Sequence, residues 1–246
     1  MEYADIHFHG LCHVDDGAAG EEEMYTMLAQ AYQDGVRTLC YTPHYHPGYF
    51  KDRQETALDR FHEVQAYSAQ RYPDLELYLG NELRYGDNCV AWLRDGRCRT
   101  YNDTRYVLVD FSEWEEKRTI VQGLEQMLNA GYLPVLGHVE RYHSLWRSDG
   151  DIRRLIDDGV LMQMDTQSLE GGFGYRVRLQ SRHLLAKGYV DLVSSDAHDP
   201  AERAPGISRA YHYIARKMGE SCAAALCRDN ARHILEGEGV RKEMYL

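Results

Sequence analysis

Histidines and carboxylates follow successive apolar runs in this sequence, at positions that suit metal-ion chemistry. The first run ends in His7-Phe8-His9, whose period of 2 projects both imidazoles to the same side of a strand. A His-x-His pair by itself is usually incidental. Comparable residues follow later runs, in Asp15-Asp16-Gly17, Thr42-Pro43-His44, Gly80-Asn81-Glu82, Val109-Asp110-Phe111, Gly137-His138 and Ser195-Asp196-Ala197-His198. Their shared placement predicts a metal site.

The donor atoms of these residues restrict the kind of ion. One at a time the residues suit ordinary roles, with Asp16 as a helix cap, Glu82 as a solvated carboxylate and His138 as a buried core histidine. Together, nitrogen and oxygen donors without thiolate suit Mn, Fe, Zn or Mg rather than structural zinc or an iron–sulfur cluster. Five imidazoles and four carboxylates exceed the needs of one ion. Two or three ions that share bridging carboxylates would use them, and such clusters activate water and clamp an in-line displacement.

Apolar, β-branched runs alternate with helical patterns along the chain. The runs predict seven strands, at 3–8, 36–42, 75–79, 106–111, 133–137, 160–165 and 189–194. A helix is predicted from Glu21 to Asp34, with further helices over 54–71, 117–130, 149–157, 175–186, 201–218 and 220–235. Repeating strand–helix units indicate an α/β fold with a parallel sheet. Because the C-terminal strand ends of a barrel surround one mouth, the convergent ligands favour a barrel over an open sheet.

Composition excludes several classes of protein. The 246 residues carry a formal net charge of −11, which argues against non-specific nucleic-acid binding. No apolar run approaches the roughly 20 residues of a membrane span, and the N-terminus lacks signal-peptide regions, so we expect a cytoplasmic protein without membrane insertion. The six cysteines form no Cys-x-x-Cys pair, which favours free thiols. Without a linker between the patterns, residues 1–246 are predicted to form a single domain.

The sequence resembles the PHP superfamily (polymerase and histidinol phosphatase), and within it the bacterial protein-tyrosine phosphatases of capsule and exopolysaccharide synthesis. The resemblance runs nearly end to end. It depends on Asp5-Ile6-His7-Phe8-His9, Val14-Asp15-Asp16-Gly17 with Glu21-Glu22, Thr42-Pro43-His44-Tyr45, Gly80-Asn81-Glu82-Leu83, His138-Val139-Glu140-Arg141-Tyr142 and Ser195-Asp196-Ala197-His198. It implies a distorted TIM-like barrel of about seven parallel strands with outer helices, and three metal ions, usually manganese.

The resemblance also implies how the ions share their ligands. One ion would take His7, His9, Glu82 and Asp196, and Glu82 would bridge to a second that also takes His138 and Asp110. The third would be held by Asp16, His44 and His198. The family most often has Glu where this chain has Asp110, whose side chain is shorter by one methylene. We therefore expect either an inward shift of this strand or an ion held more weakly.

Two arginines match phosphate-binding positions of the family. Arg141 lies in the His-x-Glu-Arg-Tyr run, and its planar fork suits bidentate contact with phosphate oxygens. Arg203, five residues after His198, aligns with a second arginine on the phosphate side. The alternatives are a salt bridge from Arg141 to Glu140 or another acid, and a solvated helix start at Arg203.

The activity implied by the resemblance is that of a manganese-dependent protein-tyrosine phosphatase, which hydrolyses phosphotyrosine by metal-activated hydroxide without a covalent phosphoenzyme. The implied partner is an autophosphorylated bacterial tyrosine kinase that regulates capsule or exopolysaccharide synthesis. A PHP phosphatase for a small metabolite such as histidinol phosphate would share every ligand and is the nearest alternative. A non-catalytic kinase-binding regulator fits less well because the ligand set is complete. An amidohydrolase fits less well because no fitting strand-end lysine is found.

Three other segments bear on substrate and mechanism. Residues 45–53 and 112–115 contain aromatic side chains that suit a phenyl ring, and Lys51 and Arg53 suit an acidic peptide, although an ordinary loop would look similar. Cys222 and Arg228 match the Cys-x5-Arg spacing of thiol-based tyrosine phosphatases. That stretch is rich in Ala and Leu and predicts a helix rather than a phosphate loop, so we expect Cys222 to be inert.

Overall fold

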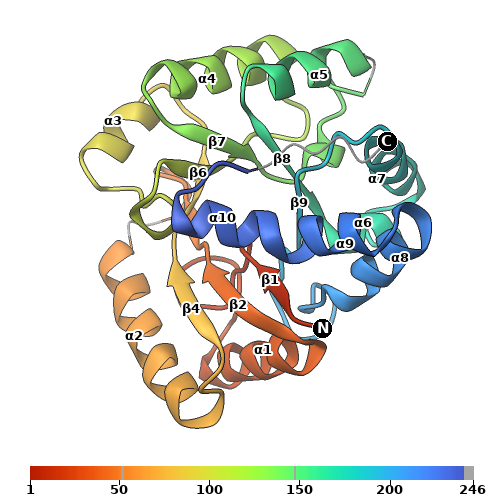
Figure 1. Ribbon diagram of the computed structural model, residues 1–246. Helices are drawn as coiled ribbons and strands as arrows, with labels where there is room; N and C mark the ends of the chain where they lie inside the picture. Colours follow the sequence, from red (N-terminus) through yellow and green to blue (C-terminus); the bar gives the residue numbers. More distant parts are fainter. Residues whose placement is uncertain (51–52, 147, 241–246) are drawn as a thin grey trace.

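The computed structural model describes residues 1–50, 53–146 and 148–240 as alternating strands and helices (Figure 1). The strands are β1 (Tyr3–Asp5), β2 (Val36–Tyr41), β3 (His44–Tyr45), β4 (Glu76–Leu79), β5 (Glu82–Arg84), β6 (Tyr106–Asp110), β7 (Leu133–Leu136), β8 (Leu161–Asp165) and β9 (Leu192–Ser194). The α-helices are α1 (Glu21–Asp34), α2 (Gln54–Arg71), α3 (Cys89–Arg94), α4 (Lys117–Asn129), α5 (Asp149–Asp157), α6 (Thr166–Glu170), α7 (Tyr175–Ala186), α8 (Ser208–Met218), α9 (Glu220–Ala224) and α10 (Asn230–Glu236). Two 3₁₀ turns, η1 (Tyr101–Asp103) and η2 (Val139–Arg141), and a π-helical turn, η3 (Ala225–Asp229), complete the described elements.

Helix α1 illustrates how the sequence determines the outer layer. Its first turn holds three glutamates, which interact favourably with the positive end of the helix dipole. Its buried residues recur at helical spacing and are Met24, Met27, Leu28 and Ala31. Gly35 ends the helix at a φ of 103°, a left-handed conformation that glycine adopts without strain. The predicted helix at this position is confirmed.

The strand pairings in the described residues are all parallel. One sheet has three strands in the order β1-β2-β4, and another has six in the order β3-β5-β6-β7-β8-β9. The predicted α/β fold with a parallel sheet is confirmed, but the structure does not show one sheet of about seven strands. Pro43, which lacks a backbone N–H, lies between β2 and β3, and Gly80 lies between β4 and β5. Strands β3 and β5 are too short for the sequence pattern to indicate them.

The helix predicted over 201–218 begins only at Ser208. The Asp199 carboxylate accepts the backbone N–H groups of residues 201–203 at 2.6 to 3.0 Å, which holds them in a turn. Pro205 then follows before the helix starts. Arg203 therefore lies in a loop, and the alternative of a helix start at this residue is wrong.

Apolar side chains close the end of the fold where the strands begin. Residues Ala231, Ile234 and Leu235 of α10 belong to one buried cluster with residues at or near strand starts, among them Ala4, Tyr106, Leu161 and Leu192. Figure 1 shows α10 crossing in front of the strands. Because apolar packing fills this end, polar chemistry is left to the opposite, C-terminal strand ends.

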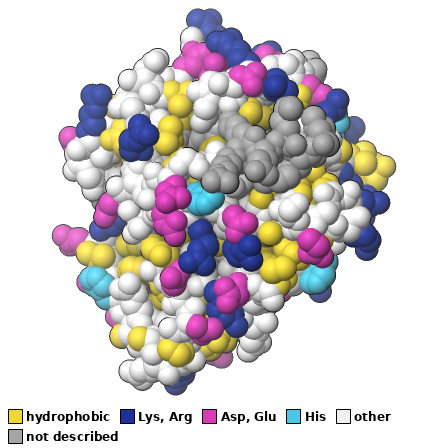
Figure 2. Space-filling view, viewed as in Figure 1, with side chains coloured by type: hydrophobic (Ala, Val, Ile, Leu, Met, Phe, Trp, Pro, Cys, Tyr) yellow, Lys and Arg dark blue, Asp and Glu magenta, His cyan; other side chains and the backbone are white. Residues whose placement is uncertain are grey.

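The surface around α10 carries charges of both signs. Figure 2 shows Lys and Arg side chains interspersed with Asp and Glu on this face. The described part of this face therefore does not present the single basic stripe typical of nucleic-acid binding. Within the described ranges, no helix is both long and apolar enough to cross a membrane.

The Cys222–Arg228 stretch is helical, as predicted. It runs from α9 through η3, and Arg228 pairs with Asp229 at 2.7 Å. Both cysteines of this stretch are buried. Burial raises the pKa of Cys222 to about 11 and raises the pKa of Cys227 as well, so neither thiol is activated as a thiolate.

Candidate metal centre

The predicted metal-binding side chains follow the C-terminal ends of strands from both sheets. His7 and His9 follow β1, and Asp196 and His198 follow β9. Backbone N–H groups join the two segments, since His9 donates to the Ala197 carbonyl and Asp196 donates to the His7 carbonyl, each at 2.9 Å. This pairing brings the first and last predicted ligands of the chain together.

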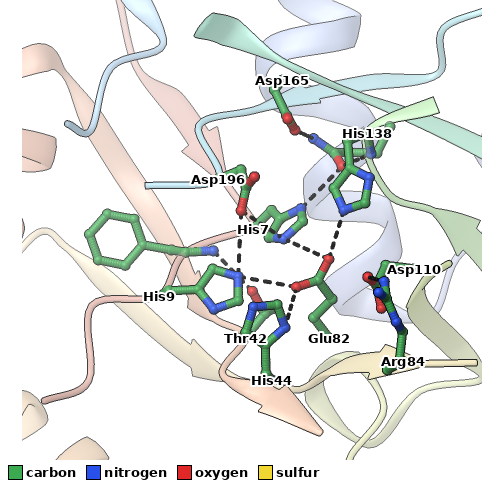
Figure 3. A network of polar contacts seen from close by, with 12 residues as sticks. His7, His9, Thr42, His44, Glu82, Arg84, Asp110, His138, Asp165 and Asp196 are labelled. Atoms are coloured by element: carbon green, nitrogen blue, oxygen red, sulfur yellow. Dashed lines mark hydrogen bonds and ion pairs between the residues drawn. The ribbon is translucent and has the colours of Figure 1, made fainter. Parts of the chain in front are cut away.

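Glu82, at the start of β5, lies at the centre of the site (Figure 3). Its Oε1 lies 3.3 Å from His7 Nε2 and 3.0 Å from His138 Nε2. Its Oε2 lies 2.8 Å from His44 Nδ1 and 3.3 Å from His9 Nε2. One buried carboxylate thus contacts imidazoles from three segments of the chain, as a bridging ligand would.

Asp196 brings a second buried carboxylate to the histidines. Its Oδ1 lies 3.2 Å from His7 Nε2, and 3.5 Å from both His9 Nε2 and His198 Nδ1. The backbone at Asp196 has a φ of 52°, and His138 has a φ of 37°. Such left-handed conformations are strained for residues other than glycine, and this strain is concentrated at functional sites.

Asp16 extends the site towards solvent. Its Oδ1 lies 3.3 Å from His44 Nε2 and 3.7 Å from His198 Nε2, while 56% of its side chain is exposed. The structure therefore brings Asp16, His44 and His198 together, as the resemblance implies.

Whether a metal ion fits this cluster can be judged from the partners and the spacing of its buried donor atoms. Among the described residues, His7 Nε2, His9 Nε2 and Asp110 Oδ1 are buried without a hydrogen-bond partner. Polar atoms buried in this way cost free energy unless they bind a ligand. Donor atoms lie within 4.8 Å of one another in four groups, namely His7-His9-Glu82, His9-His44-His198, Asp15-Asp16-His44 and Glu82-Asp110-His138. Nitrogen and oxygen donors at this spacing fit divalent metal ions.

The charges of the site shift the pKa values of two histidines in opposite directions. Burial lowers the pKa of His7, but Glu82 and Asp196 outweigh burial and raise it to about 10. Burial and the neighbouring His9 lower the pKa of His198 to about 3, so this ring is neutral, the form that binds metals. The Glu82 and Asp196 carboxylates thus favour a positive charge next to His7. Either a proton on the imidazole or a bound metal ion can supply this charge.

Residues around the histidines fix the orientation of their rings. Gln163 Oε1 contacts His7 Nδ1 at 3.1 Å and accepts the backbone N–H of His138 at 2.8 Å. Asp15 Oδ2 lies 2.8 Å from His9 Nδ1. With Nδ1 held in this way, Nε2 of His7 and of His9 is directed towards the carboxylates, an arrangement common around metal-binding histidines.

Arg141 lies in η2 and contacts two carboxylates of the site. Its Nε donates to Asp165 at 3.0 Å, and its Nη2 donates to Asp165 and, at 2.5 Å, to Asp196. The salt bridges of Arg141 therefore involve these two acids rather than Glu140. Its Nη1 lies 3.8 Å from Glu113, beyond hydrogen-bond distance.

Arg203 approaches the same carboxylate from the loop before α8. Its Nη2 lies 2.6 Å from Asp196 Oδ2, the oxygen that Arg141 also contacts. Phe173, between α6 and α7, lies beside both guanidinium groups, with its ring centroid 4.2 Å from Arg141 Cζ and 6.0 Å from Arg203 Cζ. The two predicted phosphate-binding arginines thus lie side by side.

Asp110 shares its carboxylate between the site and Arg84. Arg84 Nη1 donates to Asp110 Oδ2 and, at 2.6 Å, to the Phe111 carbonyl. Burial and the Glu82 carboxylate raise the pKa of Asp110 to about 6, although Arg84 acts in the opposite direction. The structure brings Asp110 to Glu82 and His138, and weaker ion binding there stays a prediction.

Residues 112–115 lie at the rim beside Arg141. Glu113 is the residue that faces Arg141 Nη1, and the Trp114 side chain is 77% exposed. The Trp114 ring lies 4.3 Å from the His143 ring, which lies 4.2 Å from Trp146. This exposed aromatic surface agrees with the predicted rim position.

Residues 45–50 form another part of the rim. The Phe50 ring stacks on His44 with centroids 5.3 Å apart, and Arg53 donates to the His13 carbonyl. A cavity of about 210 Å³ opens here, lined by residues that include His44, Tyr45, Phe50, Arg53 and Arg97. The predicted role of Lys51 lies outside the described residues.

Several described residues that contact the ligands or the arginines have no role in the sequence prediction, among them Asp15, Gln163, Asp165 and Phe173. A sequence signal was present for Asp165, Gln163 and Asp15. Asp165 ends a predicted strand as the ligands do, Gln163 lies two residues earlier on the same strand face, and Asp15 lies next to Asp16. Phe173 lies in a loop between two helices, where no pattern in a single sequence indicates its neighbours.

Known proteins similar to this chain include bacterial tyrosine phosphatases. A family model described as "Capsular polysaccharide synthesis, CpsB/CapC" matches residues 3–236. "Tyrosine-protein phosphatase CpsB" of Streptococcus pneumoniae is 34% identical over 236 residues, which cover 94% of this chain and 97% of that protein. "Tyrosine-protein phosphatase YwqE" of Bacillus subtilis (strain 168) is 26% identical over 239 residues, which cover 97% of this chain and 94% of that protein.

Solved structures agree with the sequence comparison. One solved structure matches this chain with a TM-score of 0.89 and 26% sequence identity. It belongs to a set of crystal structures of YwqE from Bacillus subtilis and CpsB from Streptococcus pneumoniae, described as "unique metal-dependent tyrosine phosphatases". The match covers 97% of this chain and 96% of that one. A lactonase from Listeria monocytogenes, at a TM-score of 0.57 and 9% identity over 97% of this chain and 92% of that one, is similar in fold alone.

Proposed function

This chain belongs to the CpsB/CapC family of capsular polysaccharide synthesis, and from that premise we propose that it is a metal-dependent protein-tyrosine phosphatase. The observation that carries the proposal is the convergence of five histidines and four carboxylates on one site, with buried donor atoms that have no hydrogen-bond partner among the described residues. Such atoms, gathered at one place, are the donors that a bound cation would use.

The proposed metal cluster holds three divalent ions, with manganese as the metal to add in assays. We propose that His7, His9, Glu82 and Asp196 hold one ion, that Glu82, Asp110 and His138 hold a second, and that Asp16, His44 and His198 hold the third. The groups His7-His9-Glu82 and Glu82-Asp110-His138 support the first two sets, and His44 shares one group with His198 and another with Asp16. When bound, such ions activate water and stabilise the charge of a transferring phosphoryl group.

Arg141 and Arg203 are proposed to bind the phosphoryl oxygens. The carboxylates of Asp165 and Asp196 hold Arg141 by Nε and Nη2, which leaves the Nη1 edge, 3.8 Å from Glu113, directed towards the rim. A guanidinium held in place in this way donates to phosphate without reorganising as charge moves in the transition state. The Phe173 ring lies beside both guanidinium groups.

A barrel that spans residues 1–246 as one domain is the architecture we propose for this enzyme. Three contacts support it. Gly80 N–H donates to Tyr41 O at 2.8 Å and Glu82 N–H to Pro43 O at 3.2 Å across the breaks between strands, and Phe8 forms a parallel bridge with Ala197. Through these contacts the two sheets would close around the site.

We propose that the substrate protein is an autophosphorylated bacterial tyrosine kinase. The two proteins would meet in the cytoplasm, where ATP-dependent phosphorylation takes place. The exposed aromatic rim around Trp114 supports a peptide rather than a small metabolite as substrate.

A substrate panel tests the proposed function. After chelation and addition of Mn²⁺, phosphotyrosine peptides should be hydrolysed with a kcat/KM at least tenfold above those for phosphoserine peptides and histidinol phosphate. A preference for histidinol phosphate would instead assign the protein to the small-metabolite phosphatases, and no hydrolysis of any of the three would remove the phosphatase assignment.

A further inference from the structure

Arg84 is a cationic side chain placed directly at one of the groups of metal-binding donors. It ends β5, two residues after Glu82, so both side chains lie on the same face of the strand. In the parallel pairing of β5 with β6, Arg84 is the register partner of Asp110. The position of Arg84 beside Asp110 is thus determined by the sheet and not by a chance contact of a long side chain.

The contacts of Arg84 reduce what Asp110 can offer a metal ion. Arg84 Nη1 donates to Asp110 Oδ2, and the Phe111 carbonyl accepts from the same nitrogen at 2.6 Å. Asp110 Oδ1 is the buried oxygen without a partner among the described residues. Asp110 is therefore left with one oxygen for an ion, and part of its negative charge is compensated by the guanidinium.

The other groups of metal-binding residues offer more donor atoms to an ion. His7, His9 and Glu82 are joined by Asp196, whose Oδ1 lies 3.2 Å from His7 Nε2. His9, His44 and His198 form another group, to which Asp16 adds an oxygen 3.3 Å from His44. Arginines contact Asp196 as well, but through Oδ2, and imidazole nitrogens of His7, His9 and His198 surround its other oxygen.

From this difference we propose that Arg84 makes the Glu82-Asp110-His138 group the weakest of three cation sites, so that the chain holds two ions tightly and exchanges the third. The inference rests on the proposed metal centre. The guanidinium occupies one carboxylate oxygen and repels a divalent cation, and both effects lower the affinity of this group for the ion.

Metal titration of the whole protein tests this inference without any assay of activity. The protein is stripped with chelator, dialysed against buffers of stepwise increasing free Mn²⁺, and analysed for Mn per chain by mass spectrometry. The wild type should bind two ions in one step and a third at a free Mn²⁺ concentration at least tenfold higher. Arg84→Gln should move the third step at least tenfold lower and leave the first two unchanged.

Three further variants identify the site and control for charge. Asp110→Asn should remove the third step alone, Arg84→Lys should keep it close to the wild-type position, and Arg153→Gln, which changes an exposed arginine paired with Asp157, should change none of the steps. Three indistinguishable steps in the wild type, or a third step that Arg84→Gln leaves unmoved or weakens, would overturn the role of Arg84. Binding of no Mn²⁺ at all would overturn the metal centre and, with it, the proposed function.

Discussion

The floor and the rim of the site differ in burial and in the kind of side chain that they carry. On the floor, His7, His9 and Glu82 are at most 1% exposed, and each contacts other ligands or residues that orient it. On the rim, Tyr49 is 75% exposed and Trp114 is 77% exposed. The floor is built from residues that lie in or shortly after the ends of parallel strands, whereas the rim is built from longer connections.

Because of this difference in burial, substitutions on the floor and on the rim should have different consequences. A side chain on the floor cannot be removed without leaving a buried charge or imidazole unpaired, which costs several kcal/mol or empties a metal site. A side chain on the rim loses only its own contacts with a partner. We therefore expect chemistry to depend on the floor and the choice of phosphoprotein to depend on the rim.

The largest effect is expected from removing a floor ligand. His138→Ala or Asp196→Ala should lower turnover of an aryl phosphate by at least about a thousandfold, because bound metal ions supply several kcal/mol of transition-state stabilisation. Metal per chain, measured by elemental analysis, should fall as well. His212→Ala, on the exposed face of α8, serves as the control and should keep both values. Wild-type metal content and rate in both floor variants would show that the site is assigned wrongly.

The next effect concerns Arg141, which links the floor to the rim. Arg141→Lys should keep the metal content and lose about a hundredfold in rate, because an ammonium preserves the charge but not the fork, and such a donor is worth on the order of 3 kcal/mol. Bound metal, unfolding midpoint and kinetics should be measured on one preparation, with Arg153→Lys as the control. A lowered midpoint with near wild-type kinetics would limit Arg141 to the salt bridges with Asp165 and Asp196.

A smaller effect is expected on the rim. Trp114→Ala should raise KM for a phosphotyrosine peptide about fivefold, the equivalent of about 1 kcal/mol of lost contact, and should leave kcat for a small aryl phosphate unchanged. Leu179→Ala, which removes an exposed apolar side chain of α7, is the matched control. Equal changes on both substrates would mean that Trp114 supports the floor rather than a peptide.

The smallest effect is expected at the buried thiols of the Cys222–Arg228 stretch. Cys222→Ser should leave kcat and KM within about twofold of wild type, because burial raises the pKa of this thiol to about 11 and the stretch is helical. Rates before and after treatment with a thiol-alkylating reagent should also agree. Loss of activity in Cys222→Ser, with circular dichroism unchanged, would point to thiol chemistry instead.

The sequence allowed the floor to be predicted better than the rim. Ligands such as His7 and Glu82 lie next to apolar runs with the periodicity of strands. The alternation of side chains along a strand and the parallel strand order together determine that the C-terminal strand ends converge. The helices over 54–71, 149–157 and 175–186 match the structure residue for residue. Breaks inside a strand, such as that at Pro43, depend on tertiary pairing, and so the division into two sheets could not be predicted from local patterns.

Residues that act through others were harder to predict. Gln163 and Asp15 matter because they hold imidazole nitrogens, and such contacts depend on side-chain geometry that spacing does not encode. The contact between Arg84 and Asp110 follows from strand register, which becomes known only when the sheet is known. The late start of α8 depends on the turn at Asp199, a local competitor of the helix.

The metal dependence of phosphotyrosine hydrolysis is tested by measuring Mn per chain and peptide hydrolysis together while Mn²⁺ is returned to chelated protein. We expect no hydrolysis without metal, a rate that rises with the number of ions bound, and full recovery in protein whose thiols are alkylated. Full activity of protein that contains no metal would contradict this metal dependence.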